Sequence, residues 1–63
     1  MRVYLNGYMC SLENSTLIFN RKEMSLYSGS LIKIDDKEYI IDKISQSKQV
    51  KALSIAELTQ VYP

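Results

Sequence analysis

Short stretches of alternating apolar and polar residues are separated along the chain by residues that favour turns. The clearest turn is Asn6-Gly7, which lies between the apolar stretches 3–5 and 8–10. Asn and Gly tolerate the positive φ angles that a two-residue type I′ turn requires. Residues 13–15 are polar, and Thr16-Leu17-Ile18-Phe19 is β-branched and aromatic, as expected of a buried strand. The first third of the chain is therefore predicted to be a three-stranded antiparallel meander.

A second hairpin is predicted in the middle of the chain. Residues 31–34 and 39–44 are both strand-like, and the acidic stretch 35–38 between them forms the turn. Residues 45–47 indicate a third turn. Residues 48–53 then return as a further strand, and their polar side chains indicate one face in water.

Two segments carry helix signals. Asn20 with Glu23 three residues later resembles a capping box, and Gly29 suits a left-handed exit, yet residues 24–27 also fit an extended segment. Ser54 and Glu57 have the Ser-x-x-Glu spacing that begins a helix or a 3₁₀ turn. We expect a short turn there, followed by a last strand over residues 58–62.

Five or six short strands with turns between them predict a mainly all-β domain over residues 1–63, a small antiparallel barrel or sandwich with one or two short helical turns. The layout of residues 29–62 resembles the second half of an SH3-like barrel. No family motif accompanies this resemblance, so it implies a fold and no function. A barrel would also remove exposed strand edges.

The composition excludes most catalytic and metal chemistry. The 63 residues include no histidine, one cysteine and two isolated glycines. A zinc site needs about four Cys or His ligands, and Ser-His or Cys-His nucleophile pairs need a histidine. The glycine fingerprint of dinucleotide sites is missing as well. We therefore predict no catalytic residue, no metal, no cofactor and no enzymatic activity.

The single cysteine, Cys10, is expected to be a small buried apolar residue. One cysteine cannot form an internal disulfide, which favours a reducing compartment. Residues 1–6 lack a signal-peptide pattern, and no apolar run exceeds three residues, as in Leu17-Ile18-Phe19. The sequence therefore predicts a cytoplasmic protein that does not act at a membrane.

Two groups of residues are candidates for partner binding. Lys43, Lys48 and Lys51 lie in a stretch without acidic residues and could bind phosphates, although such runs are more often a solvated strand face. Five of the six aromatic residues are tyrosines, and exposed tyrosines serve as interface anchors or as stacking platforms for bases. Tyr8 and Tyr39 are the candidates because each lies beside a predicted hairpin turn.

The leading hypothesis is a small non-catalytic binding or regulatory module that contacts a protein partner through an aromatic-bearing barrel face or an exposed strand. The abundance of Lys, Ile, Tyr and Asn suggests an accessory protein of a phage or mobile element. A first alternative is a nucleic-acid-binding barrel that uses the lysines with a stacked tyrosine. A second is a structural subunit that forms a homo-oligomer because its core is small.

Overall fold

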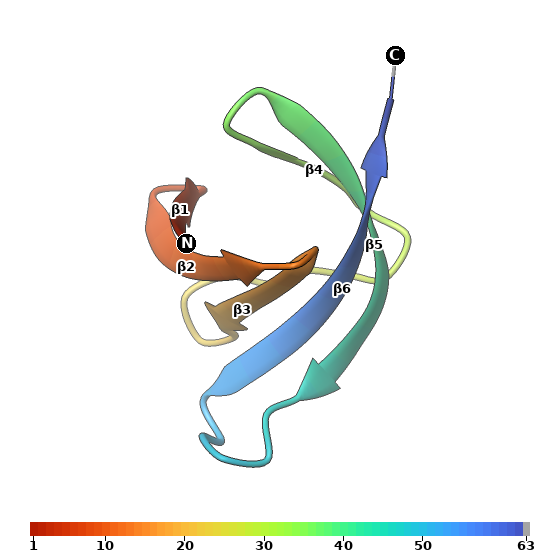
Figure 1. Cartoon of the computed structure of the whole chain (residues 1–63). Coiled ribbons are helices and arrows are strands. Elements are labelled where there is room, and N and C mark those ends of the chain that lie inside the picture. Colours follow the sequence, from red (N-terminus) through yellow and green to blue (C-terminus); the bar gives the residue numbers. More distant parts are fainter. Residues whose placement is uncertain (63) are drawn as a thin grey trace.

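The computed structural model describes residues 1–62, and all of their regular secondary structure is β-strand (Figure 1). The strands are β1 (Arg2–Leu5), β2 (Tyr8–Glu13), β3 (Thr16–Asn20), β4 (Leu31–Ile34), β5 (Lys37–Gln46) and β6 (Leu53–Val61). All six belong to one antiparallel sheet, which confirms the predicted all-β class. Residues 1–62 contain no helix that is long and apolar enough to cross a membrane.

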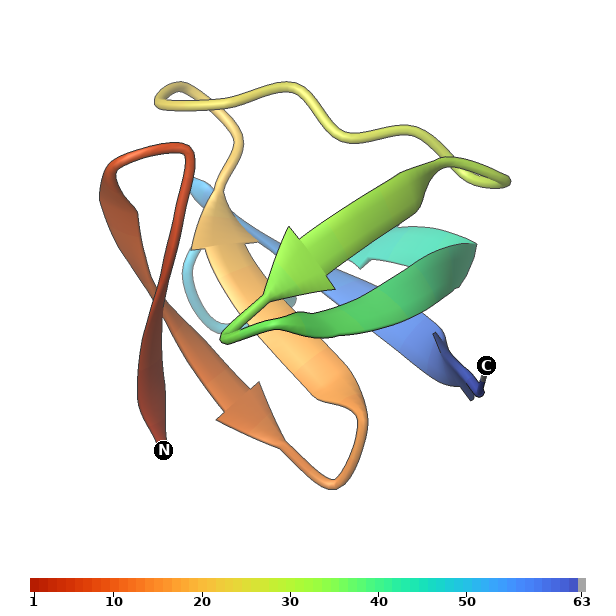
Figure 2. The same cartoon turned by 90° about the horizontal axis from the view of Figure 1, so that it is seen from above.

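The sheet joins two meanders. Its strand order is β1-β2-β3-β6-β5-β4, so the N-terminal meander pairs with the C-terminal one through β3 and β6. Seen from above, the sheet curls until its outermost strands, β1 and β4, face each other, while residues 21–30 pass along one side (Figure 2). The strands β1 and β4 come close to each other but do not pair. The result is a half-barrel, consistent with a small β-barrel.

Three hairpins have two-residue turns with both residues in the left-handed region. The φ angles are 53° and 83° at Asn6-Gly7, 49° and 62° at Asn14-Ser15, and 49° and 68° at Asp35-Asp36. Such turns match the right-handed twist of the flanking strands. The two predicted hairpins are confirmed, and the acidic turn is shorter than predicted because β5 already begins at Lys37.

The core fills the concave face of the curled sheet. Alternate residues of each strand point inward, and Leu17, Ile41 and Ala56 have no exposed surface. Burying a leucine or isoleucine side chain contributes about 1.5–3 kcal/mol. The remaining buried apolar residues are Val3, Leu5, Cys10, Leu12, Phe19, Met24, Ile32, Ile34, Tyr39 and Leu58.

The C-terminal third differs from the prediction. No helical turn begins at Ser54, because β6 is one continuous strand that pairs with β3 on one side and with β5 on the other. Both ladders satisfy the backbone groups that a capping box would otherwise bind. Ser54, Ala56 and Leu58 face inward while Glu57 is exposed, which is a strand alternation.

The predicted strand over residues 48–53 is also wrong. Residues 47–52 form the connection between β5 and β6. In this connection the hydroxyl oxygen of Ser47 accepts hydrogen bonds from the backbone N–H groups of Gln49 (3.3 Å) and Val50 (3.2 Å). The resemblance to an SH3-like barrel depended on this strand and on the helical turn after it, and the structure does not support that layout.

The connection between β3 and β4 combines both interpretations offered for it. The carbonyl oxygen of Asn20 accepts hydrogen bonds from the N–H groups of Glu23 (3.0 Å) and Met24 (3.3 Å), which makes one helical turn. The side-chain oxygen of Asn20 accepts from the N–H of Lys22 at 2.9 Å. The chain is then extended, with Met24 buried in the core and Leu26 packed against it.

Candidate functional site

The outer edge of β4 presents unpaired main-chain groups. The carbonyl oxygen of Ser30 accepts a hydrogen bond from the N–H of Ile41 at 2.9 Å, which makes this a bonded pair of the β4–β5 ladder. Bonded and non-bonded pairs alternate along an antiparallel ladder. Ile32 is therefore the next bonded residue, and the N–H and C=O groups of Leu31 and Lys33 point away from β5. No strand within residues 1–62 pairs with this edge.

The edge of β1, which faces β4 across the curled sheet, also presents unpaired main-chain groups. The carbonyl oxygen of Met1 accepts a hydrogen bond from the N–H of Leu12 at 2.8 Å. Alternation along the β1–β2 ladder then directs the main-chain groups of Arg2 and Tyr4 away from β2. Closure of the sheet, which was expected to remove exposed edges, is therefore incomplete in the described residues.

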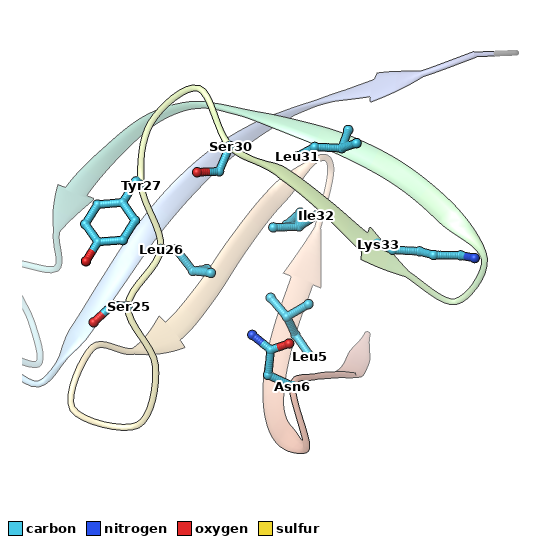
Figure 3. Close-up of a pocket in the computed structure, with 9 residues that line it drawn as sticks. All are labelled: Leu5, Asn6, Ser25, Leu26, Tyr27, Ser30, Leu31, Ile32 and Lys33. Carbon is cyan, nitrogen blue, oxygen red and sulfur yellow. The ribbon is translucent and has the colours of Figure 1, made fainter.

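A cavity of about 350 Å³ lies between these two edges. In Figure 3 the side chains of Leu5, Leu26 and Ile32 point toward one another across it. All three belong to the core or pack against it, so they form an apolar floor. The residues that complete the lining are Asn6, Ser25, Tyr27, Ser30, Leu31 and Lys33.

The wall formed by residues 25–30 is fastened to β5 at a β-bulge. The register between β5 and β6 shifts between Ile41 and Lys43, which leaves Asp42 as the extra residue. The hydroxyl of Ser28 donates a hydrogen bond to the backbone carbonyl oxygen of Asp42 at 2.8 Å. The backbone N–H of Gly29 donates one to the carbonyl oxygen of Ile41 at 2.7 Å. The bulge thus holds the connection in place beside the cavity.

The two candidate tyrosines have opposite environments. Tyr8, the first residue of β2, is 43% exposed. Tyr39 is only 8% exposed and belongs to the core, so its predicted availability to a partner is wrong. The reason is that Tyr39 lies within β5 directly opposite Ile32, and its side chain faces inward together with those of Ile32 and Ile41. Tyr4, Tyr27 and Tyr62 are the more exposed tyrosines.

The three candidate lysines lie in two different elements. Lys43 lies on β5 directly opposite Glu57 of β6, so an acidic residue accompanies it. Lys48 and Lys51 lie in the connection between β5 and β6, where both are exposed. Lys48 and Lys51 thus share one connection, whereas Lys43 lies in the strand that precedes it.

Cys10 is buried, as predicted, with 5% of its surface exposed. Burial raises the pKa of its thiol above the ordinary value of 9.0, and the negative charge of Glu23 raises it further. A thiol with a raised pKa is a poor nucleophile at neutral pH. No three His, Cys, Asp or Glu side chains within residues 1–62 are placed to hold a metal ion.

No pattern in the sequence indicates the free edge of β4. Its binding groups are main-chain N–H and C=O groups, which every non-proline residue has. Whether they are free depends on the strand order, because the same residues in a central strand would be paired on both sides. Comparison with protein-family models, curated proteins and solved structures finds no match for this chain, so the site is interpreted from its own geometry.

Proposed function

We propose that this chain is a non-catalytic protein-binding module that takes up an extended segment of a partner protein along the free edge of β4. The observation that carries the proposal is the coincidence of unpaired main-chain groups at Leu31 and Lys33 with an apolar cavity beside them. Strand addition to an exposed edge combines main-chain hydrogen bonds with pockets for alternate side chains.

The register of β4 specifies which side chain of the partner enters the cavity. Partner residues opposite Leu31 and Lys33 form the bonded pairs, and their side chains lie on the outer face. The residue between them lies opposite Ile32 and projects to the inner face. It meets Leu5 and Leu26 there, so an apolar side chain fits this position.

Charge specifies a second position. Lys33 is exposed on the outer face of the edge strand. Opposite charges placed directly across two strands contribute about 0.2–1 kcal/mol, so an acidic partner residue fits opposite Lys33. In an antiparallel arrangement this residue immediately precedes the apolar one. The expected ligand is therefore an extended segment with an acidic residue followed by an apolar residue.

Selection of peptides from a displayed random library against the immobilised protein tests the proposal. We expect the selected peptides to contain an acidic residue followed by an apolar one. Backbone amide NMR shifts on binding should be largest at Leu31, Lys33 and Leu26. A library that yields no binder, or binders that shift only residues on other strands, would contradict the proposal.

The substitution Lys33→Pro isolates the role of the main chain. Proline removes the N–H that points away from β5, so it deletes no hydrogen bond of the sheet, and proline is tolerated on edge strands in this orientation. The matched control Lys33→Ala also removes the charge but keeps the N–H. We expect Lys33→Pro to bind a selected peptide at least about tenfold more weakly than Lys33→Ala, as the loss of a main-chain hydrogen bond at a binding site implies.

Two results of this comparison would overturn the assignment. One is equal peptide binding by the proline and alanine variants, provided that both unfold at similar denaturant concentrations. The other is self-association of the wild-type chain that Lys33→Pro abolishes, seen by sedimentation velocity. That result would assign the edge to a second copy of the chain instead of a partner protein.

A further inference from the structure

The two connections at one end of the molecule bring together basic residues that are far apart in the sequence. The backbone N–H of Arg21 donates a hydrogen bond to the carbonyl oxygen of Ala52 at 3.2 Å. This bond ties residues 21–23 to residues 47–52, which lie near each other in the lower part of Figure 1. The two connections carry Arg21, Lys22, Lys48 and Lys51, all of which are exposed.

Charge is therefore distributed unevenly over the molecule. Glu23 is the one acidic residue in these two connections, so four cations and one acid give this end a formal charge of +3. The whole chain carries +1, which leaves −2 for the remainder. The acidic turn Asp35-Asp36 is separated from this end by the ten residues of β5, about 33 Å of extended strand. We call the end formed by residues 21–23 and 47–52 the basic end.

Apolar side chains on the outer face of the sheet adjoin the basic end. The β2–β3 ladder ends at the pair Ser11 and Ile18, and Met9 lies on the part of β2 beyond it. Met9 is 48% exposed. A hollow of about 340 Å³ opens on the outer face here, and its apolar lining includes Met9, Ile18 and Leu53.

We propose that this chain binds single-stranded nucleic acid at the basic end. The four cations contact backbone phosphates, and unpaired bases lie in the hollow beside Met9 and Leu53. A single strand fits better than a duplex because its bases are free to contact an aromatic or apolar surface. The site is distinct from the edge of β4. It also differs from the predicted trio of lysines, because Arg21 and Lys22 take part and Lys43 does not.

The number of cations sets the expected salt dependence. For a single strand, log K falls with log[salt] with a slope of about 0.7 per neutralised phosphate, so four contacts give a slope of about −2.8. The affinity should then fall about 50-fold between about 50 and 200 mM salt. A fluorescence anisotropy titration of a labelled oligothymidine of about 12 nucleotides measures this slope.

A pair of double variants with equal changes in charge tests the location. The double variant Lys48→Gln, Lys51→Gln removes two of the four cations, so the salt slope should change from about −2.8 to about −1.4. Its binding at about 50 mM salt should be at least about tenfold weaker than that of the wild type. The double variant Lys33→Gln, Lys37→Gln removes the same charge from the β4–β5 hairpin. It should change the affinity for the oligonucleotide by less than about threefold, because distant exposed charges are screened. Met9→Ser should weaken binding to the single strand and leave the salt slope unchanged.

Several outcomes would overturn the proposal. These are absence of oligothymidine binding at low salt, equal effects of the two double variants, and equal affinity for a duplex and the single strand. Binding to vesicles of anionic lipid through Lys48 and Lys51 in the absence of oligonucleotide binding would assign the basic end to membranes instead. The variant Lys33→Pro should bind the oligonucleotide normally, so the outcome is independent of the peptide site.

Discussion

The hydroxyl of Ser28 donates a hydrogen bond to the backbone carbonyl oxygen of Asp42 at 2.8 Å. Asp42 is the bulged residue of β5, and the bulge interrupts its pairing with β6. The bond therefore uses a carbonyl group that the interrupted ladder leaves available. It fixes the long connection beside the cavity at the edge of β4, so a feature of the central sheet positions the proposed peptide site.

Removal of this contact should loosen the wall of the cavity. Ser28→Ala is expected to lower the free energy of unfolding by about 0.5–1 kcal/mol, because the bond is exposed to solvent. Hydrogen exchange at the amide of Gly29 should become faster, since the neighbouring anchor to Ile41 then opens more often. Ser25→Ala is the control, because Ser25 lies in the same connection and is exposed. Equal exchange in the two variants would show that the Ser28 bond does not hold the connection.

Introducing a glycine and removing one at left-handed turn positions should have opposite effects on the free energy of unfolding. Ser15 has a φ of 62°, a conformation that costs an L-residue about 1–2 kcal/mol relative to glycine, so Ser15→Gly should stabilise the protein by up to about 1 kcal/mol. Gly7 has a φ of 83°, and Gly7→Ala should destabilise it by about 1 kcal/mol through backbone strain alone. Urea unfolding measures both changes. A loss of stability in Ser15→Gly would contradict the explanation.

Leu17 makes a large contribution to the stability of this small core. Its side chain is fully buried, so Leu17→Ala should cost about 2–5 kcal/mol through lost burial and the cavity that remains. A chain of this size has a total stability of about 3–9 kcal/mol, and much of the variant should be unfolded at room temperature. Leu31→Ala, at a 58% exposed position, should cost less than about 0.5 kcal/mol. Circular dichroism during thermal unfolding distinguishes the two variants.

The buried thiol of Cys10 makes stability depend on alkaline pH. Its pKa is raised in the folded protein, first by burial and then by Glu23, so the unfolded chain loses this proton at a lower pH. The stability that the protonated thiol contributes to the folded state is fully present below the ordinary pKa of 9.0 and decreases as the pH rises above it. Urea unfolding at about pH 7.5 and about pH 9.5 should show a larger loss of stability in the wild type than in Cys10→Ala.

Alkylation provides a second measurement of the same thiol. Iodoacetamide should modify Cys10 much more slowly in the folded protein than in urea, because the thiolate is both rare and covered. Glu23→Gln should lower the pKa of the thiol partway and speed the reaction. Rapid alkylation of the folded wild type would mean that Cys10 is accessible, contrary to its 5% exposure.

Local residue chemistry predicted the two hairpins correctly and the C-terminal third less well. Asn6-Gly7 and Asp35-Asp36 form turns because Asn, Gly and Asp tolerate positive φ better than other residues do. The Ser54 and Glu57 spacing equally favours a helix start, yet these residues lie in a strand between β3 and β5. Pairing on both sides satisfies more backbone groups than one capped turn, so tertiary contacts overrode the local signal.

The candidate sites show the same division. The sequence identified Tyr8, Lys48 and Lys51 as exposed polar or aromatic residues, because their side-chain chemistry favours contact with water. It made Tyr39 a candidate for contact with a partner, but the ring lies in the core because Tyr39 shares the inward face of β5 with Ile41. Neither the free edge of β4 nor the meeting of Arg21 with Ala52 could be predicted, because both depend on residues distant in the sequence.

By itself, the sequence determined the strand class, the turns of the two hairpins and the absence of the residues that most catalytic and metal chemistry needs. These follow from backbone preferences, alternation and composition, which act over a few residues. Only the tertiary structure decided which edges remain unpaired and which charges gather at one end. Strand order and the register shift at Asp42 result from pairing between segments as far apart as β3 and β6, and such pairing depends on the burial of the whole core.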